Sequence, residues 1–321
     1  MHVHIQNRPR DHFVPLTAEL VHEATKGSAH RFTISDDDDG FAQAALTMEV
    51  LVTTSDQVLA RFPSPAPSLK AVFLKHAGVD ALIDVNPLPA GIMLLNNSGA
   101  HAEKAGQYVL MAALMLQNGL PIYLGQQHDR IWLPHFSGTL SGKRVSILGV
   151  GGLGSAAAKA LSPYSVHLTG IRSQPRPHSA FDRILPFEAL DDALPQTDIL
   201  VLAAPLTALT RHVMNARRLA LLPPHAGIIN ISRGELIEEA ALIETLNRRG
   251  LAGAILDVTA TEPPAPDDPL WTCPNLVLTP HVSATDMGTY ARQTIRILLE
   301  NLEDMTAGRP ARNRVDLVRG Y

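Results

Sequence analysis

Short apolar runs alternate with amphipathic stretches along residues 1–100. The apolar runs predict parallel strands, and the stretch Thr17–Thr25 has the spacing of a helix. The expected strands are His2–Gln6, Arg31–Ile34, Val50–Thr53, Ala71–Lys75 and Ile92–Leu95. Because each crossover helix returns the chain to the same end of the sheet, this alternation predicts an α/β fold.

A long apolar stretch and a second alternating series follow. His101–Gln117 predicts a long, largely buried helix, and a polar, irregular segment follows from Pro121. After a strand that starts at Val145, the further strands expected are Val166–Ile171, Ile199–Ala204, Ile228–Ile231, Ala254–Val258 and Leu276–Thr279, with helices at Ala216–Leu222, Glu239–Asn247 and Gly288–Met305. This order is expected of a Rossmann sheet, so the chain is predicted to hold two Rossmann-like domains with doubly wound parallel sheets.

A glycine-rich turn joins a buried strand to a small-residue helix within Val145–Leu161. Gly149, Gly151 and Gly154 have G-x-G-x-x-G spacing. In such a turn the first glycine permits the tight bend, the second lets the backbone approach a pyrophosphate, and the third lets the helix pack on the strand. The turn predicts a dinucleotide site, whose expected contacts also include Gly152 and Leu153.

Composition narrows the class of protein. With 321 residues, 45% hydrophobic and 18% charged, the chain fits two globular domains. The net charge of −4 favours no nucleic acid partner, and no apolar run reaches the roughly 20 residues of a membrane span. Cys273 is the single cysteine, and Asp36–Asp39 is interpreted as a solvated loop that caps the next helix, so no metal is expected. With no signal-peptide pattern, a cytoplasmic protein is expected.

Three chemically active side chains follow successive predicted strands. They are Arg233, Glu262 and His281. The carboxyl ends of parallel strands meet at one edge, so these side chains are expected to converge. Arginine offers a fork for a carboxylate, and histidine beside a carboxylate exchanges a proton near neutral pH. With a nicotinamide cofactor, this set predicts a carbonyl reductase.

The motifs from Leu140 to Ala284 resemble the D-isomer-specific 2-hydroxyacid dehydrogenase family. The resemblance is carried by Ala204–Thr207 with Thr210, Ile229–Leu236, Gly253–Val258, Glu262–Pro263, Asp268–Trp271 and Leu278–His281. It implies that Arg233 binds the substrate carboxylate and polarises the carbonyl, that His281 donates the proton, and that Glu262 pairs with His281. It also implies cofactor contacts by Pro205, Thr210, Ile231, Arg233 and Asp257, and a substrate loop around Ala77 and Gly78.

The resemblance implies the domain layout as well. The substrate domain would be discontinuous, formed by residues 1–100 and 284–321, and residues 101–283 would form the dinucleotide-binding domain. The two domains would close over the substrate and exclude water. The helix from His101 is typical of the family's dimer contact, so a homodimer is expected. Trp132 lies where some relatives turn an aromatic side chain toward the neighbouring subunit, although a Trp in an apolar loop usually only packs against its surroundings.

Two departures from the family pattern bear on specificity. Where NAD enzymes place an acidic residue for the ribose, near Gly170, this chain has none, and Arg172 with Ser173 could bind a 2′-phosphate; we therefore expect NADP(H) to be preferred over NAD(H). In the substrate loop, Lys75 or His76 could add a donor for an acidic substrate; for Lys75, the other interpretation is a side chain turned to solvent. His101 and Gln107 also depart from the common pattern.

The function expected from the sequence is reduction of a small 2-keto acid, of glyoxylate or hydroxypyruvate type, to a D-2-hydroxy acid. Two alternatives stay open at this point. A 3-phosphoglycerate dehydrogenase would need further basic residues for the phosphate. A cofactor-sensing protein, like the corepressors that resemble this family, would use a peptide groove and tails.

Overall fold

The computed structural model describes residues 1–7, 15–83, 85 and 87–320; Tyr321, at the end of the expected substrate domain, lies outside them. The chain forms two compact units. The first consists of Met1–Ala100 with Asp286–Tyr321, and the second of His101–Thr285. The sequence placed the crossings near Ala100 and Ser283, and the units divide after Ala100 and after Thr285.

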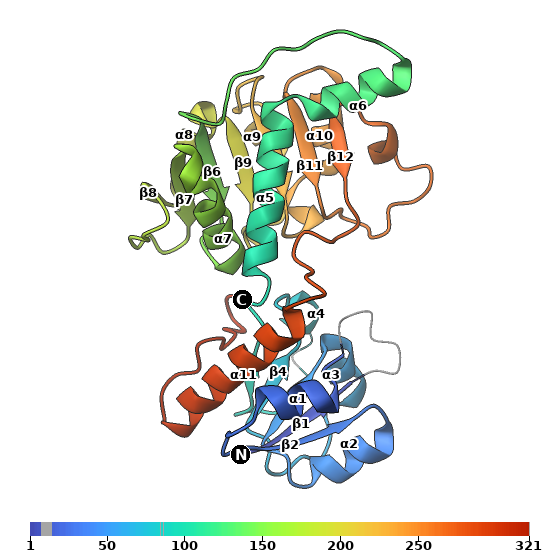
Figure 1. Ribbon diagram of the computed structural model, residues 1–321, viewed down its shortest axis with the longest axis vertical. Coiled ribbons are helices and arrows are strands. Elements are labelled where there is room, and N and C mark those ends of the chain that lie inside the picture. Colours follow the sequence, from blue (N-terminus) through green and yellow to red (C-terminus); the bar gives the residue numbers. More distant parts are fainter. Residues whose placement is uncertain (8–14, 84, 86, 321) are drawn as a thin grey trace. The chain divides into compact units, whose positions relative to one another are not determined.

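The first unit is built on a five-stranded parallel sheet in the order β2-β1-β3-β4-β5 (Figure 1). Its strands are β1 (His2–Gln6), β2 (Arg31–Ser35), β3 (Val50–Thr53), β4 (Ala71–Leu74) and β5 (Met93–Leu95). Its helices are α1 (Ala18–Ala24), α2 (Asp38–Ala45), α3 (Ser55–Arg61), α4 (Asp80–Ile83) and α11 (Tyr290–Thr306). Asp37 caps α2 by accepting a hydrogen bond from the backbone N–H of Gly40, as the interpretation of the acidic run expected, but Asp38 and Asp39 form the first turn of the helix and are not part of a loop.

Side chains of alternating strand positions bury against helices on both faces of this sheet. Ile5, Val52 and Phe73 pack with α1 and α11, whereas Leu51 and Leu74 pack with α2, α3 and α4. The alternation follows from the strand period of two, and it explains why the strands read as continuous apolar runs. The sheet is therefore doubly wound, and its carboxyl edge is left for ligands.

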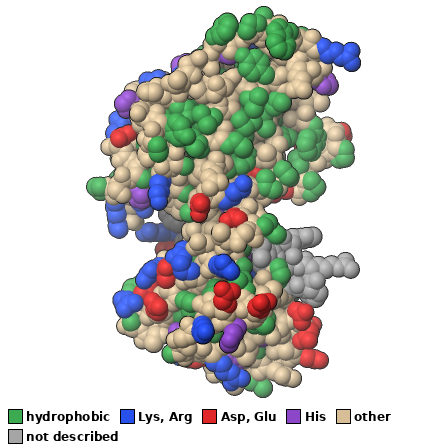
Figure 2. Space-filling model, viewed as in Figure 1, with side chains coloured by type: hydrophobic (Ala, Val, Ile, Leu, Met, Phe, Trp, Pro, Cys, Tyr) green, Lys and Arg blue, Asp and Glu red, His purple; other side chains and the backbone are tan. Residues whose placement is uncertain are grey.

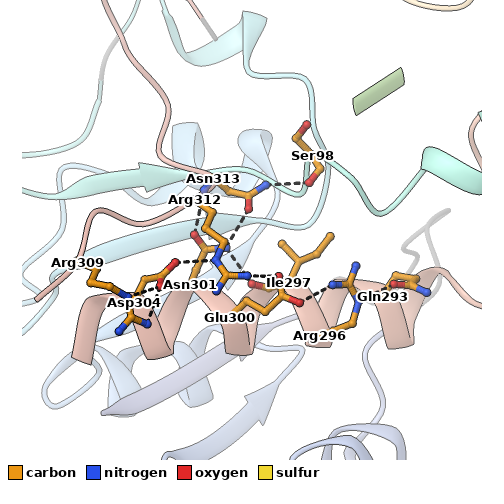
Figure 3. A network of polar contacts seen from close by, with 10 residues as sticks. All are labelled: Ser98, Gln293, Arg296, Ile297, Glu300, Asn301, Asp304, Arg309, Arg312 and Asn313. Carbon is orange, nitrogen blue, oxygen red and sulfur yellow. Dashed lines mark hydrogen bonds and ion pairs between the residues drawn. The ribbon is translucent and has the colours of Figure 1, made fainter. Parts of the chain in front are cut away.

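A C-terminal segment runs back along α11 and pairs with the edge strand β5. Leu95 and Arg314 form an antiparallel bridge. The buried side chain of Asn301 on α11 donates to Asn313 Oδ1 and accepts from the Asn313 backbone N–H, at 3.0 Å each (Figure 3). Asn313 in turn donates to the carbonyl of Ser98 at 2.8 Å. These bonds tie the segment to the loop that leads to the first crossing.

The second unit contains a seven-stranded parallel sheet in the order β12-β11-β10-β9-β6-β7-β8. Its strands are β6 (Arg144–Leu148), β7 (His167–Arg172), β8 (Arg183–Pro186), β9 (Ile199–Leu202), β10 (Gly227–Asn230), β11 (Gly253–Leu256) and β12 (Leu276–Leu278). Its α-helices are α5 (Ala102–Gln117), α6 (Leu120–Asp129), α7 (Gly152–Leu161), α8 (Leu190–Ala193), α9 (Ala216–Leu219) and α10 (Glu239–Asn247). Short 3-10 helices cover Ser162–Tyr164, Phe187–Ala189, Leu194–Gln196, Gly234–Leu236 and Pro269–Thr272.

Helices cover both faces of this second sheet as well. Small residues of α5 and α7 pack with Ile147 and Val201, and side chains of α8, α9 and α10 pack with Leu200 and Leu256 on the other face. The predicted fold class, α/β with two doubly wound parallel sheets, is confirmed.

Three strands or α-helices of the second unit differ from the prediction; one is the short helix α8, which was not expected. The edge strand β8 was not expected, and the segment from Pro121 was expected to be irregular but begins inside helix α6. Gly119, at φ +67°, turns the chain, and Pro121 then lies in the first helical turn, where its missing N–H has no helical partner to lose.

Among the described residues, no single helix is long and apolar enough to cross a membrane; only α5 and α6 taken together, bent by 62° at their junction, have the required length and composition. The described part of the chain also holds no group of three or more His, Cys, Asp or Glu side chains placed to bind a metal ion.

Candidate active site

The glycine turn between β6 and α7 has the geometry that the sequence predicted. Gly149 lies at φ +101°, and a Cβ there would come within 2.5 Å of the Ala203–Ala204 backbone. A Cβ on Gly154 would lie 1.9 Å from the Gly149 carbonyl oxygen. At Gly151, by contrast, a Cβ would meet no described atom within 4 Å. Gly149 and Gly154 thus permit close packing of the backbone, and Gly151 leaves the backbone beside the α7 N-terminus open.

That open backbone fits a dinucleotide. The first N–H groups of α7, including those of Gly152 and Leu153, have no carbonyl partner within the helix, and Gly151 provides no capping side chain. The helix dipole adds positive potential at the same end. Pyrophosphate oxygens are acceptors that these donors suit.

The end of β7 carries the side chains that the sequence predicted to lie near the ribose of the cofactor. Arg172 is its last residue, and the chain then turns outward through exposed Ser173. In the part of the chain that the structure describes, Arg172 forms no ion pair with a carboxylate. Gly170 lies inside β7, where a Cβ would lie 2.6 to 2.9 Å from the side chains of Ile184, Val150 and Phe181, so a larger residue there would require these side chains to shift.

Further turns at the same sheet edge are fixed by polar contacts. Thr210 Oγ1 donates to the Pro205 carbonyl at 2.6 Å and accepts from the Thr207 N–H at 2.8 Å. Ser232 Oγ donates to the Ala204 carbonyl, while neighbouring Ile231 is buried. These bonds hold the loops after β9 and β10 against each other.

Arg233, Glu262 and His281 follow three adjacent strands, β10, β11 and β12. His281 Nδ1 and Glu262 Oε2 are 2.8 Å apart, and both side chains remain partly exposed. Glu262 Oε1 also accepts from the Thr259 N–H at 3.2 Å. Arg233 Nη1 donates to the Ser232 carbonyl at 2.7 Å. The expected His–Glu contact is therefore present, with Arg233 on the neighbouring strand end.

Asp257 organises the loop that carries His281. It is buried, and its carboxylate accepts from Thr279 Oγ1 at 2.6 Å and from the N–H groups of Val282 and Ser283 at 2.8 Å each. Its carbonyl accepts the His281 N–H at 2.9 Å. These bonds hold the backbone of His281 at φ +53°, in the left-handed region that residues other than glycine rarely adopt.

Tyr108 on α5 extends this network. Its hydroxyl lies 2.6 Å from Thr279 Oγ1; because Thr279 donates to Asp257, Tyr108 is the donor. Burial raises the pKa of Tyr108 to about 12, with a further contribution from the charge of Asp257, so the hydroxyl keeps its proton. The sequence indicated neither Tyr108 nor Thr279, because the contact joins residues 171 positions apart.

A cavity of about 520 Å³ lies beside these residues. It is lined by Asp257, Thr259, Glu262, Pro263, Pro264, Trp271, Leu278, Thr279, Pro280 and His281. His101 lies close to the same loop, because its Nδ1 contacts the Ala284 carbonyl at 2.7 Å. Burial lowers the pKa of His101, and the charge of His281 lowers it further.

Ala77 and Gly78 belong to the first unit, in the loop between β4 and α4. Asn97 donates to the carbonyls of Lys75 and His76, at 3.0 and 3.1 Å, and Asn96 donates to that of Ala77 at 3.0 Å. Among the described residues, no acceptor bonds the backbone N–H of Ala77, Gly78 or Val79. A row of free N–H groups is a feature that binds anions.

Known proteins place the chain in a family. The model of the "D-isomer specific 2-hydroxyacid dehydrogenase, NAD binding domain" matches residues 110–283. The glyoxylate/hydroxypyruvate reductase A of Yersinia enterocolitica is 32% identical over 79% of this chain and 82% of its own length.

Solved structures of members of the same family are similar to this chain over its whole length. A D-isomer-specific 2-hydroxyacid dehydrogenase of Xanthobacter autotrophicus, in complex with NADPH and MES, aligns with a TM-score of 0.85 and 29% identity over 100% of this chain and 99% of that one. An NADPH-dependent glyoxylate/hydroxypyruvate reductase of Sinorhizobium meliloti, in complex with NADP and sulfate, aligns with a TM-score of 0.80 and 26% identity over 100% and 99%.

The doubly wound sheet and its glycine turn define a dinucleotide-binding oxidoreductase domain, with the histidine and carboxylate of a dehydrogenase at its edge. The chain belongs to the D-isomer-specific 2-hydroxyacid dehydrogenase family, whose members are NAD(P)-dependent dehydrogenases and reductases of small 2-hydroxy and 2-keto acids.

Proposed function

We propose that this protein reduces a small 2-keto acid, of glyoxylate or hydroxypyruvate type, to its D-2-hydroxy acid with NADPH. The observation that carries the proposal is the 2.8 Å contact between His281, in the segment after β12, and Glu262, in the loop after β11; Arg233 follows the neighbouring strand β10. Several relatives named glyoxylate/hydroxypyruvate reductase A support this substrate class.

In this proposal His281 gives its proton to the carbonyl oxygen of the substrate. Glu262 holds the imidazole through Nδ1, so that Nε2 faces the substrate. The guanidinium of Arg233 binds the substrate carboxylate and polarises the carbonyl. Separately, the N–H groups of the first unit's loop at Ala77 and Gly78 are proposed to bind a carboxylate. NADPH, when bound, supplies the hydride.

The cofactor would be held by this chain's own backbone and side chains. The N–H groups from Gly151 to Gly154 would bind the pyrophosphate, and the loops that contain Pro205, Thr210 and Ile231 would line the site. Asp257 would face the nicotinamide side of the cofactor with its carboxylate oxygen Oδ2, which accepts one hydrogen bond, from the Ser283 N–H.

Arg172 and Ser173 are proposed to select NADPH over NADH. The structures in complex with NADPH and NADP support this choice, as does Arg172 at the end of β7, which forms no ion pair with a carboxylate among the described residues. An arginine binds phosphate through two parallel hydrogen bonds, whereas NADH offers only hydroxyls there.

Initial rates of NADPH and NADH oxidation with glyoxylate, hydroxypyruvate, pyruvate and phenylpyruvate test the function. We expect turnover of the two small acids, faster with NADPH, and loss of turnover in H281A. An enzyme that binds NADPH but turns over none of these acids would contradict the proposal.

The R172A variant tests cofactor choice. We expect the KM for NADPH to rise about 10- to 100-fold, the effect of losing a charged hydrogen bond, with the KM for NADH unchanged. R183A is the matched control, because Arg183 is an exposed arginine at the start of β8, whereas Arg172 lies at the end of the parallel neighbour β7. Equal NADPH affinity in wild type and R172A would contradict the proposed role of Arg172 in cofactor choice.

We also propose that two copies of the chain form a dimer through the face of α5. Figure 2 shows hydrophobic side chains gathered on the face that carries this helix. Met111, Leu114, Leu120 and Leu124 are exposed, and the segment after α6 presents Trp132 and Phe136 with exposed fractions of 100% and 91%. A patch of this kind on a monomer marks a protein interface.

Light scattering tests the dimer. We expect the wild type to have the mass of two chains and the M111E/L114E double variant to have the mass of one, because buried unpaired carboxylates destabilise an interface. L46E, which changes an exposed leucine of the first unit, should stay dimeric. A monomeric wild type would contradict the proposal.

A further inference from the structure

The side chain of His76 bridges two segments of the first unit. Its Nε2 lies 3.0 Å from the backbone N–H of Ser55, the first residue of α3, and its Nδ1 lies 2.8 Å from the Gly78 carbonyl. The Ser55 N–H can only donate, so Nε2 is the acceptor and the ring proton is on Nδ1. The imidazole therefore donates to the Gly78 carbonyl in its neutral form.

The hydrogen bonds that the carbonyl oxygens of this loop accept determine where its N–H groups point. In a trans peptide, the C=O of one residue and the N–H of the next point in opposite directions. The bonds to the carbonyls of His76, Ala77 and Gly78 therefore fix the N–H groups of Ala77, Gly78 and Val79, respectively. His76 alone, among the described residues, fixes the last of these three peptide planes.

The Gly78–Val79 peptide is the plane that most needs such a bond. Glycine accepts backbone angles that other residues avoid, so this plane can turn over with little strain. If it did, a carbonyl oxygen would replace the Val79 N–H on the anion-facing side and repel a carboxylate. The hydrogen bond from Nδ1 of His76 opposes that rotation.

We propose that His76 is a positioning residue for substrate binding: it holds the Val79 N–H toward the substrate carboxylate by fixing the Gly78 carbonyl. This inference rests on the proposed function, in which the loop binds that carboxylate. It also answers whether His76 is a donor to the substrate, a role that the sequence left open. Both ring nitrogens are engaged within the unit, so His76 acts through the loop and is not itself a donor to the substrate.

Three variants separate the two hydrogen bonds of the ring. H76A removes both. H76N keeps an N–H donor near the position of Nδ1 and loses the acceptor for Ser55, whereas H76Q keeps an acceptor near the position of Nε2 and loses the donor to Gly78. H22A, which changes an exposed histidine at the end of α1, is the control.

The steady-state readouts are kcat, the KM for glyoxylate, the KM for NADPH and the inhibition constant of oxalate. For H76A we expect the KM for glyoxylate and the inhibition constant of oxalate to rise about tenfold, with kcat and the KM for NADPH within about threefold of wild type. H76N should restore both constants to within about threefold of wild type, and H76Q should resemble H76A. H22A should match the wild type.

Two results would overturn the inference. One is a KM for glyoxylate in H76A within about twofold of wild type. The other is rescue by H76Q and not by H76N, which would make His76 only a cap of α3. If H76A does not fold, the comparison of H76N with H76Q still decides between these roles.

Calorimetric titration of oxalate into the NADPH-bound protein keeps this test apart from the proposed function. If the wild type turns over no 2-keto acid, the proposed function fails, and the titration still decides the inference. Weaker oxalate binding in H76A than in H76N supports it; equal binding in the two variants, or no binding to the wild type, overturns it.

Discussion

At the scale of single residues, the pair of His281 and Glu262 was predicted from the sequence, but its support was not. Strand ends in order along the chain indicated which side chains meet. The chain Tyr108, Thr279 and Asp257 appears only in the fold, since a threonine and a tyrosine carry no pattern of their own. That chain holds the backbone of His281 in a left-handed conformation.

Replacing Thr279 with valine tests this support. T279V removes one donor to Asp257 and leaves the buried Tyr108 hydroxyl without its acceptor, which costs about 1–3 kcal/mol of stability. We expect kcat with glyoxylate to fall about tenfold or more, because displacement of a reacting group by a fraction of an ångström slows catalysis. The KM for NADPH should change little.

Y108F is the matched control for T279V. It removes the outer hydroxyl and leaves the bond from Thr279 to Asp257 intact. Its kcat should stay within about threefold of wild type, with a modest fall in melting temperature. A T279V enzyme as fast as wild type would show that Asp257 holds the loop without Thr279.

At the scale of elements, nearly all strands and the long helices were predicted, because a buried strand or an amphipathic helix repeats its pattern over several residues. The strand β8 was missed. Its four residues, Arg183–Pro186, have no alternation, and they are a strand only because they pair with β7. The helix α6 was missed as well. Gly119 and Pro121 indicate a loop in the sequence, but in the structure they lie at the start of this helix.

The glycine turn gives a prediction at this scale. G151A should fold as stably as wild type, since a Cβ there meets no described atom within 4 Å and φ is −92°, yet it should weaken NADPH binding about tenfold or more by keeping the pyrophosphate from the backbone. Thermal melting without cofactor and a fluorescence titration with NADPH measure the two effects.

G154A is the comparison for G151A. Its Cβ would lie 1.9 Å from the Gly149 carbonyl oxygen, so α7 must shift, and we expect a loss of about 1–3 kcal/mol in stability. Unchanged NADPH affinity in a fully folded G151A would place the pyrophosphate elsewhere.

At the scale of the whole molecule, each unit contains a histidine whose burial lowers its pKa below 6.5: His4 in the first unit and His101 in the second. The unfolded chain therefore binds more protons than the folded chain just below pH 6.5. The stability that these neutral histidines contribute is present above pH 6.5 and is lost as the pH falls from there toward the folded-state pKa.

We expect the free energy of unfolding, measured with urea, to fall between pH 7 and pH 5. H4Q should have a smaller slope with pH over this range, because the titrating group is gone; its stability at pH 7 is lower through lost hydrogen bonds to Thr33 and Ser35. The exposed His22, changed to Gln, serves as the control and should keep the wild-type slope. A pH-independent wild type would contradict this account.

The sequence by itself determined the two doubly wound sheets, the glycine turn and the identity of Arg233, Glu262 and His281. Each of these is a local pattern: apolar periodicity, a glycine spacing, or a polar side chain within a few residues of the end of a strand. Tertiary structure alone decided the edge strand β8, the network from Tyr108 to Asp257, and the bond from His76 to Gly78. These depend on contacts made after the chain has folded, in which one group satisfies the hydrogen-bonding need of another, and no local pattern records such a partner.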